Sequence, residues 1–301
     1  MPHAWHVIDA SSFSEGHFNQ VSMSQETQSA APSKLLDPIE DVIQAISQGQ
    51  MVVVVDDEHR ENEGDLVMAG QWVNAEAVTF MAKMGGGLIC VPTTEERLRQ
   101  LGISEMVSDN RDSFRTDFQV SVDAAKGITS GISGPDRALT VQVMANPSST
   151  PSDLVQPGHI FPLRAKSGGV LQRAGHTEAA LDLARMAGCR PIAMICEIMN
   201  DDGTMARRDD LIKFSEIHDL KIGTIADLIH YRTLKEKSVH LEYSKSVDVH
   251  GIKFELTAWR DSIFDNLHLA FVKGDLKTSK SPLVRVHVPN TLHDLIGIEE
   301  F

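Results

Sequence analysis

Apolar residues in this chain fall into short continuous runs and into longer stretches with helical spacing. Residues 51–55, MVVVV, have no polar position, which predicts a strand buried on both faces. In the preceding stretch, LLDPIEDVIQAISQG, apolar residues recur at three- and four-residue intervals. We therefore expect a helix there, with Asp37 as its cap, Pro38 at its first position and Gly49 at its end.

The same alternation of helix and strand patterns continues to about residue 232. Helical spacing follows Asn74 as far as Gly85, and it returns in TEERLRQLG, HTEAALDLARMAG, DDLIKFSEIHDL and TIADLIHYR. Strand patterns are found in LICVP, FQVSVD and PIAMICEIM. Strands mixed with helices predict an α+β domain, an α/β mixed sheet with covering helices, over residues 34–232.

The two ends of the chain differ from this central part. Residues 1–33 are rich in Ser, Gln and His without periodicity, which predicts a disordered N-terminal tail. Residues 234–246 are highly charged and are expected to form a connector. Three strand-like runs follow, KFELTAWRD, NLHLAFVKGD and PLVRVHV, and they predict a small β-rich module at about 240–301.

Composition and net charge argue against several classes of protein. The net charge of −14 argues against nucleic acids and anionic membranes as partners, although local cations could still bind a phosphorylated metabolite. The 3 cysteines include no CxxC pair, so a disulfide framework and a structural zinc site are not expected. No apolar run approaches the roughly 20 residues of a membrane span. We expect a cytoplasmic protein.

The acidic run DDEHRENEGD, residues 56–65, follows directly on the valine strand. It contains Asn62 and Gly64, which favours a loop over a helix. Two interpretations stay open, a solvated surface loop and a site for a hard divalent cation such as Mg²⁺ or Mn²⁺, which prefer carboxylate ligands.

The segment LQRAGHTEAA places Arg173, His176 and Thr177 where a helix is expected to begin. Free N–H groups at a helix N-terminus, together with an arginine and a hydroxyl, suit a phosphate group. His176 could also bind a metal ion. The alternative is that Thr177 caps the helix and Arg173 makes a surface ion pair.

Other candidates give weaker signals. Glu197 stands alone in an apolar strand, where it either faces solvent or lines a cleft as a general base. His159 lies between two prolines in PGHIFPLRA, which we interpret as a stiffened loop, and a lone loop histidine is more often inert than catalytic. ITSGISGPDR, residues 128–137, could form a phosphate-binding nest. Cys90 is expected to pack in the core.

Four of these motifs, in order, resemble 3,4-dihydroxy-2-butanone 4-phosphate synthase: DDEHRENEGD, PGHIFPLRA, RAGHTEAALDLARMAG and CEIMNDDGTMAR. The resemblance covers about residues 36–232. It implies a homodimer of α+β subunits that converts ribulose 5-phosphate to the four-carbon phosphate and formate in riboflavin biosynthesis. It also implies two divalent ions, usually Mg²⁺, with Mn²⁺ as a substitute.

The resemblance assigns roles by position. It implies that Glu61 and His176 bind metal, that His159 and Glu197 are essential for catalysis, and that Glu63 is a candidate proton shuttle. The implied substrate contacts are Arg60, Glu61, Asp65, Arg173, Ala174, Gly175, His176, Thr177 and Glu197. The sequence departs from the family at His59, where an acid is common, and at Ser130, where threonine is more usual.

The C-terminal part resembles the opening of GTP cyclohydrolase II in HLAFVKGD and LVRVH. That family's first zinc-binding cysteine would fall near Asn290, and no cysteine follows Cys196 in this sequence. We therefore expect a truncated, inactive cyclohydrolase-like module after a metal-dependent lyase. The disfavoured alternatives are a bifunctional synthase and cyclohydrolase, or a non-catalytic scaffold, which would be free to lose the motif residues present here.

Overall fold

The structure, a computed structural model, describes residues 36–276, 278 and 281–288. The predicted tail, residues 1–33, lies outside the described residues, as does the end of the predicted C-terminal module. No helix in the described part of the chain is both long and apolar enough to cross a membrane.

The four valines form strand β1 (Val52–Val55), and all four side chains are buried. Val53 and Val55 pack in one hydrophobic core, whereas Val52 and Val54 pack in a second core on the opposite face. The predicted strand buried on both faces is therefore confirmed. β1 lies between β2 (Gly64–Ala69), which is antiparallel to it, and β7 (Lys221–Thr224), which is parallel.

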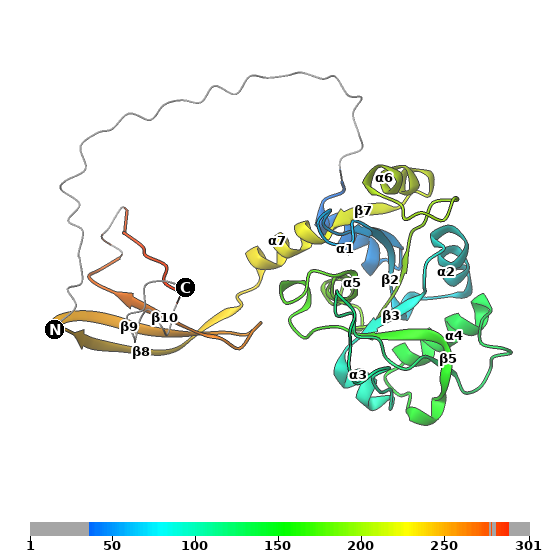
Figure 1. The fold of residues 1–301 in the computed structure, drawn as a ribbon, viewed down its shortest axis with the longest axis horizontal. Coiled ribbons are helices and arrows are strands. Elements are labelled where there is room, and N and C mark those ends of the chain that lie inside the picture. Colours follow the sequence, from blue (N-terminus) through cyan, green and yellow to red (C-terminus); the bar gives the residue numbers. More distant parts are fainter. Residues whose placement is uncertain (1–35, 277, 279–280, 289–301) are drawn as a thin grey trace, which may run out of the picture. The chain divides into compact units, whose positions relative to one another are not determined.

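These strands belong to a seven-stranded mixed sheet with the order β4-β5-β3-β6-β2-β1-β7. Figure 1 labels β2, β3, β5 and β7 of this sheet. The remaining strands are β3 (Cys90–Thr93), β4 (Val122–Ala124), β5 (Leu154–Arg164) and β6 (Ala193–Glu197). Two neighbouring pairs are parallel (β1 with β7, β3 with β5), and the other four are antiparallel. The predicted mixed α/β sheet is confirmed.

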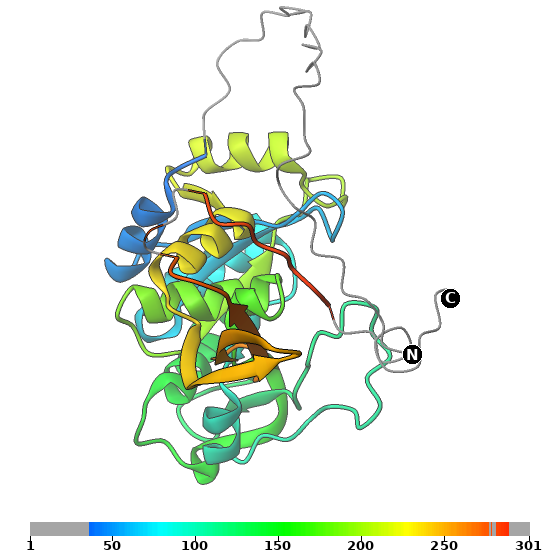
Figure 2. The same ribbon diagram turned by 90° about the vertical axis from the view of Figure 1, so that its left-hand side faces the viewer.

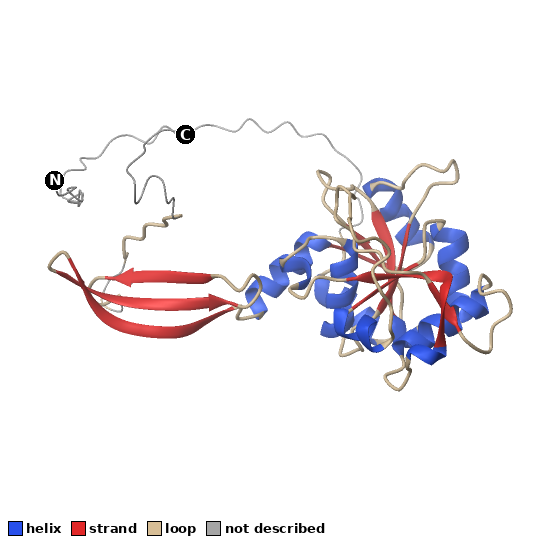
Figure 3. Ribbon diagram, turned by 60° about the horizontal axis from the view of Figure 1, so that its bottom comes forward, coloured by secondary structure: helices blue, strands red, loops and turns tan. Residues whose placement is uncertain are grey.

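Helices cover both faces of this sheet (Figure 3). The helices that contribute to one core are α2 (Ala75–Phe80), α3 (Glu95–Gln100), α4 (Gly134–Ala145) and α6 (Arg208–Ile217). Those that contribute to the other are α1 (Ile39–Ser47), α5 (His176–Met186) and α7 (Ile225–Lys235). The short helical turns are η2 (Gly70–Trp72), η4 (Pro151–Asp153), η5 (Gly169–Leu171) and the π-helical η3 (Met81–Gly85).

The C-terminal module is a three-stranded antiparallel sheet, coloured orange in Figure 2, with the order β10-β9-β8. Its strands are β8 (Val239–Val249), β9 (Ile252–Asp261) and β10 (Leu267–Val272). The prediction of a charged connector over 234–246 was wrong, because most of it belongs to β8. Val239, Leu241 and Tyr243 alternate there with His240 and Glu242, which is the period-2 pattern of a strand. The run PLVRVHV at 282–288, predicted as a strand, forms none.

The start of the synthase-like domain also differs from expectation. The N-cap of α1 is Pro38, and no side chain caps the helix. The Asp37 carboxylate instead accepts hydrogen bonds from the Ile222 N–H (3.0 Å) and the Lys221 ammonium (2.8 Å), so it attaches this segment to β7. Gly49 follows the helix with φ +79°, as expected of a glycine that ends a helix.

A buried ion pair joins α7 to α5. The Arg232 guanidinium donates to the Asp182 carboxylate at 2.7 Å and to the Gly168 carbonyl at 2.9 Å. Only 10% of the Arg232 side chain and 3% of the Asp182 side chain are exposed. The Val170 N–H also donates to Asp182, so one carboxylate holds both α7 and the turn η5.

Arg232→Met should lower the free energy of unfolding by about 3 kcal/mol, because it leaves the buried Asp182 without its guanidinium. The matched control is Arg111→Met. Arg111 pairs with Asp109 at the surface, where the two side chains are 86% and 69% exposed. Its loss should change stability by less than about 1 kcal/mol. Denaturant unfolding of both variants measures the difference, and equal losses would contradict the prediction.

Candidate active site

The acidic run forms a compact loop around one carboxylate, that of Asp56. Asp56 is buried at the end of β1, and its oxygens accept hydrogen bonds from the Glu61 N–H (3.2 Å), the Glu63 N–H (2.8 Å) and the Arg60 guanidinium (2.8 Å). The Arg207 guanidinium also holds this loop, because it donates to the Glu61 carbonyl at 2.8 Å and to the Asn62 carbonyl. The run is therefore a folded loop and not a freely solvated one.

Strands β2 and β6 bring two more carboxylates together. Asp65 and Glu197 are directly paired residues of these antiparallel strands, and adjacent strands lie about 4.8 Å apart. The Leu88 N–H donates to Glu197 Oε2 at 2.8 Å. A Cβ on Gly87 would lie 2.5 Å from the same oxygen, so glycine permits this close approach.

His176 comes from the first turn of α5. The N-cap is Gly175, and no side chain caps this helix, so the interpretation of Thr177 as a cap was wrong. The side chain of His176 is only 6% exposed, and its Nδ1 lies 3.6 Å from Glu61 Oε2 and 3.7 Å from Asp65 Oδ1. The first helix N–H groups have no acceptor within the helix, which leaves them available to an anion.

Three side chains of this region could hold a cation together. Asp56, Glu61 and His176 each offer a ligand atom, and these atoms lie within 4.8 Å of one another. Two buried polar atoms beside them, His176 Nε2 and Asp65 Oδ1, have no hydrogen-bond partner among the described residues. Buried polar atoms without partners are costly, so the group fits a divalent ion with carboxylate and imidazole ligands.

Burial and the proximity of other charged side chains shift the pKa values of these groups. Burial, helped by neighbouring carboxylates, raises the pKa of Asp65 to about 7. Burial opposes the charge on His176, but the surrounding carboxylates, Asp65 foremost, raise its pKa to about 9. Burial also raises the pKa of Glu63. In Glu61 the effect of burial is outweighed by His176 and Arg60, so its pKa is lowered. An added cation would relieve the repulsion among these carboxylates.

The two arginines of the site are held by the segment between α3 and β4, which runs as a long loop (blue-green in Figure 2). Arg173 donates to Glu178 at 2.6 Å, to the Thr116 hydroxyl at 3.0 Å and to the Phe114 carbonyl at 3.1 Å. Glu178 is buried, so the alternative of a surface ion pair was wrong. The Arg60 guanidinium carbon lies 5.1 Å from the centre of the Phe114 ring.

His159 does not belong to this group of contacts. Its segment was interpreted as a loop but lies within β5, which β3 and β6 separate from β2. Its ring bonds Asp123 of β4, with Nδ1 2.7 Å from Oδ2. The described part of one chain thus joins Arg60, Glu61, Asp65, His176 and Glu197, whereas His159 forms a second cluster.

The segment 128–137, predicted as a phosphate-binding nest, binds a carboxylate of the protein itself. The Thr129 and Gly131 N–H groups both donate to Asp136 Oδ2, at 3.1 Å and 3.0 Å. These two groups are therefore not free for a phosphate. Cys90 is buried in β3, and burial raises the pKa of its thiol well above the usual value, so the expectation of a packed residue is confirmed.

Comparison with known proteins decides the family. A sequence profile described as 3,4-dihydroxy-2-butanone 4-phosphate synthase matches residues 40–231, which contain every residue of both clusters. The chain belongs to the 3,4-dihydroxy-2-butanone 4-phosphate synthase family. Its activity is that of this family, in riboflavin biosynthesis. A second profile, GTP cyclohydrolase II, matches residues 240–300, which confirms the resemblance of the C-terminal part.

Three relatives support this assignment. A 3,4-dihydroxy-2-butanone 4-phosphate synthase of Pseudomonas syringae pathovar tomato is 54% identical over 87% of this chain and 71% of its own length. A two-domain synthase from A. baumannii, RibBX, superposes with a TM-score of 0.79 at 46% identity, covering 87% of this chain and 77% of its own. A synthase in complex with two magnesium ions gives a TM-score of 0.64 at 44% identity, covering 66% and 98%.

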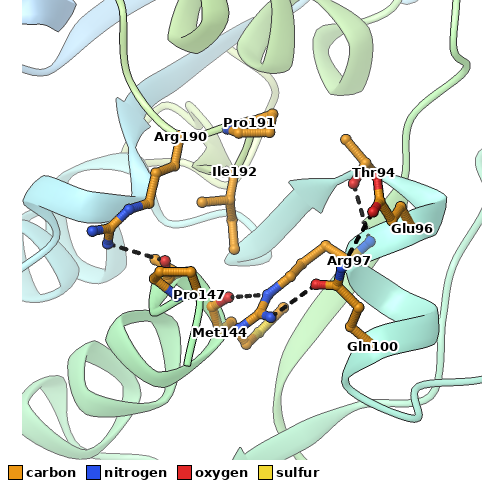
Figure 4. Close-up of a pocket in the computed structure, with 10 residues that line it drawn as sticks. Thr94, Glu96, Arg97, Gln100, Met144, Pro147, Arg190, Pro191 and Ile192 are labelled. Carbon is orange, nitrogen blue, oxygen red and sulfur yellow. Dashed lines mark hydrogen bonds between the residues drawn. The ribbon is translucent and has the colours of Figure 1, made fainter. Parts of the chain in front are cut away.

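A cavity of about 200 Å³ on the synthase domain lies apart from these residues (Figure 4). It is lined by two arginines. Arg97 donates to the Met144 and Asn146 carbonyls, and Arg190 donates to the Ala145 carbonyl, at the C-terminal end of α4. These cations satisfy the last carbonyls of a helix, so helix capping accounts for the two arginines in this cavity.

Sequence reasoning missed three participants, namely Asp56, Asp123 and the loop that carries Phe114 and Thr116. Asp56 had a usable signal, because it continues the alternation of Val52 and Val54 on one face of a strand. Asp123 and the loop had none, because their contacts to His159 and Arg173 depend on pairing between distant segments.

Asp56→Ala should loosen the acidic loop, because three donors lose a charged acceptor. Protection of the Glu61 and Glu63 amides against hydrogen exchange should fall by about 10- to 100-fold, as expected from hydrogen bonds worth about 1.5–3 kcal/mol. The control is Asp57→Ala, which removes a bond from the His59 N–H alone. Unchanged exchange in Asp56→Ala would contradict this account of the loop.

Proposed function

We propose that this synthase is a metal-dependent lyase that converts D-ribulose 5-phosphate to 3,4-dihydroxy-2-butanone 4-phosphate and formate. The observation that carries the proposal is the convergence of Asp56, Glu61 and His176 within 4.8 Å, beside the buried Asp65. A set of carboxylates around one imidazole suits a hard divalent ion.

The proposed ligands are Glu61 and His176, and the proposed cofactor is two Mg²⁺ ions, which Mn²⁺ could replace. The related synthase in complex with two magnesium ions supports the number and the element. Bound ions would stabilise negative charge on the oxygens of the sugar. Asp56 holds the backbone of Glu61 through its N–H and so orients this ligand.

The proposed substrate contacts are divided between the loop and α5. Arg60 and Asp65 would contact the sugar, and the run Arg173, Ala174, Gly175, His176 and Thr177 would bind its phosphate. The first N–H groups of α5 point along the helix axis and favour an anion. Arg173 adds positive charge there, and its bonds to Glu178 and Thr116 keep it beside the helix.

The reaction requires several proton transfers. Ribulose 5-phosphate must be enolised, lose water, rearrange and release one carbon as formate. Substrate and products contain the same atoms, so the water that is lost is taken up again when formate leaves. We assign these transfers to Glu63, Glu197 and His159. Glu63 lies at the loop, Glu197 beside Asp65, and His159 carries an imidazole suited to general acid–base catalysis.

Two expectations of the sequence stay predictions, a homodimer and a cytoplasmic location. The predicted lack of cyclohydrolase activity in residues 240–301 also stays a prediction. A non-catalytic scaffold is disfavoured, because Glu61, His176 and Glu197 are all present.

EDTA should abolish formate release from ribulose 5-phosphate, and Mg²⁺ in excess should restore it. Mn²⁺ should restore it as well. The measurement is formate production before and after chelation, with thermal unfolding as a check that the protein stays folded. Metal analysis should show that the ions have been removed. If turnover is then undiminished, the proposed metal dependence is contradicted.

Glu61→Gln and His176→Ala should each lower kcat by more than about 100-fold, because each removes a proposed ligand. The control is Glu58→Gln in the same loop, where the Glu58 side chain is 77% exposed. It should retain full activity. Paramagnetic resonance of Mn²⁺ should show weakened binding in the first two variants alone. Equal activity of Glu61→Gln and Glu58→Gln would contradict the assignment.

A further inference from the structure

The backbone of the acidic loop is held by one acid and one arginine. Asp56 accepts the Glu61 and Glu63 N–H groups at 3.2 Å and 2.8 Å. Nη1 of the Arg207 guanidinium donates to the Glu61 carbonyl at 2.8 Å and to the Asn62 carbonyl. The carboxylate therefore binds the N–H groups of this segment, and the guanidinium binds its carbonyls.

The N–H and carbonyl groups of residues 61–63 are all bonded within the described part of the chain. Besides the bonds above, the Asn62 N–H donates to the Asp57 carbonyl at 3.3 Å, and the Asp56 N–H donates to the Glu63 carbonyl at 3.2 Å. The guanidinium is the partner that comes from outside the loop. Its loss would leave two successive carbonyls to water and would release the loop from the rest of the fold on that side.

The guanidinium holds a turn of uncommon conformation. Asn62 has φ +54°, in the left-handed region, which asparagine tolerates better than most residues. Such a conformation persists where the surroundings fix it. The carbonyls on both sides of the turn, those of Glu61 and Asn62, accept from the same nitrogen of Arg207. The arginine thus stabilises the turn next to Glu61.

Arg207 reaches the loop because the chain turns back after β6. The Ile198 N–H donates to the Gly64 carbonyl at 2.9 Å, so the pairing between β2 and β6 continues past Glu197. The Ala206 N–H then donates to the Ile198 carbonyl at 3.0 Å, which brings the returning chain beside the end of β6. The position of Arg207 therefore follows from the same strand that carries Glu197.

Arg207 is also the N-cap residue of α6, which fixes its backbone. Its N–H donates to Asp210 Oδ2 at 3.2 Å. One turn further along, Leu211 is 0% exposed, and a Cβ on Gly64 would lie 2.5 Å from its Cδ1. Glycine therefore allows α6 to approach the end of the loop closely. The buried start of the helix sets the place from which the guanidinium reaches the two carbonyls.

We propose that Arg207 is a positioning residue of the metal site, which holds the Glu61 backbone so that the Glu61 carboxylate stays beside His176. Glu61 Oε2 lies 3.6 Å from His176 Nδ1. A partner that orients a ligand before an ion binds raises the affinity of the site. The bonds of Arg207 to the loop are to carbonyls, so it acts through the backbone of Glu61. This inference rests on the proposed role of Glu61 as a metal ligand.

The first test is hydrogen exchange of the metal-free full chain in Arg207→Met and in a matched control, Arg208→Met. Arg208 is the exposed first residue of α6, and its replacement removes the same charge. Exchange of the Glu61 and Glu63 amides should rise about 10- to 100-fold in Arg207→Met, as expected when bonds to a charged group are lost. It should stay unchanged in Arg208→Met. Equal exchange in the two variants overturns the inference.

Metal binding gives a readout that damage elsewhere in the fold would not produce. The dissociation constant of Mn²⁺, measured by paramagnetic resonance, should rise about 10- to 100-fold in Arg207→Met. The Mg²⁺ concentration that gives half-maximal formate release should rise by the same factor. At saturating Mg²⁺, kcat should return to within about threefold of the unaltered value, because a bound ion itself orders Glu61. An unchanged Mg²⁺ requirement, or a loss of kcat that Mg²⁺ does not restore, overturns the inference.

The outcomes separate this inference from the function on which it rests. If Glu61→Gln binds Mn²⁺ as tightly as the unaltered protein, the proposed ligand role of Glu61 fails. If Glu61→Gln binds weakly but Arg207→Met binds normally, the positioning role alone fails and the lyase assignment stands. If the Glu61 and Glu63 amides of the unaltered metal-free protein exchange as fast as those of an unfolded peptide, the inference falls even when Arg207→Met does not fold.

Discussion

The burial of β1 on both faces is the constraint on which the candidate active site depends. Val52–Val55 are buried in two cores, one on each face of the sheet, so the position of the strand between the two helical layers is fixed. The residue that follows it, Asp56, must then lie at the edge of that core. Its carboxylate is too costly to leave there without donors, and the nearest ones are the N–H groups of the next residues. The core thereby folds the acidic loop.

The loop then gathers more negative charge than its own cation can balance. Arg60 bonds both Asp56 and Glu61, yet Asp65 and Glu197 add carboxylates from the neighbouring strands. Burial raises the pKa of Asp65 and the neighbouring carboxylates raise it further, whereas at His176 the carboxylates raise the pKa against the effect of burial. A divalent ion at Glu61 and His176 would replace such protons, and metal binding to protonated ligands releases them. Burial and crowding together therefore explain the unusual titration, and the crowding of carboxylates explains the suitability for metal.

The sequence predicted strands β1, β3, β4 and β6 and most helices, because these depend on local spacing, but it did not predict β2, β5 or β7. It failed where long-range pairing outweighs local preference. His159 lies in β5 although prolines flank it, since pairing with β3 and β4 holds the segment extended. Asp37 binds β7 and does not cap α1. The donors that it binds belong to Lys221 and Ile222, which lie 184 and 185 positions further along the chain. Charged residues in β8 obscured a strand. Asp123 looked like an ordinary strand residue, and its two hydrogen bonds to His159 of the neighbouring strand reveal the reason for its place.

Asp56 and Asp123 show the same solution to one problem, which is how a flexible functional side chain acquires the rigidity of the fold. Each is a buried acid at a strand, and each accepts both a backbone N–H and a side chain of the functional segment. Asp56 thus joins the backbone of Glu61 to Arg60, and Asp123 joins the backbone of His159 to its ring. Both roles need two acceptor oxygens on one short stem. Asparagine offers one acceptor oxygen and a donating amide. At Asp56 it would therefore lose acceptors that N–H donors require, and at Asp123 it could keep the ring only by reversing the direction of that hydrogen bond.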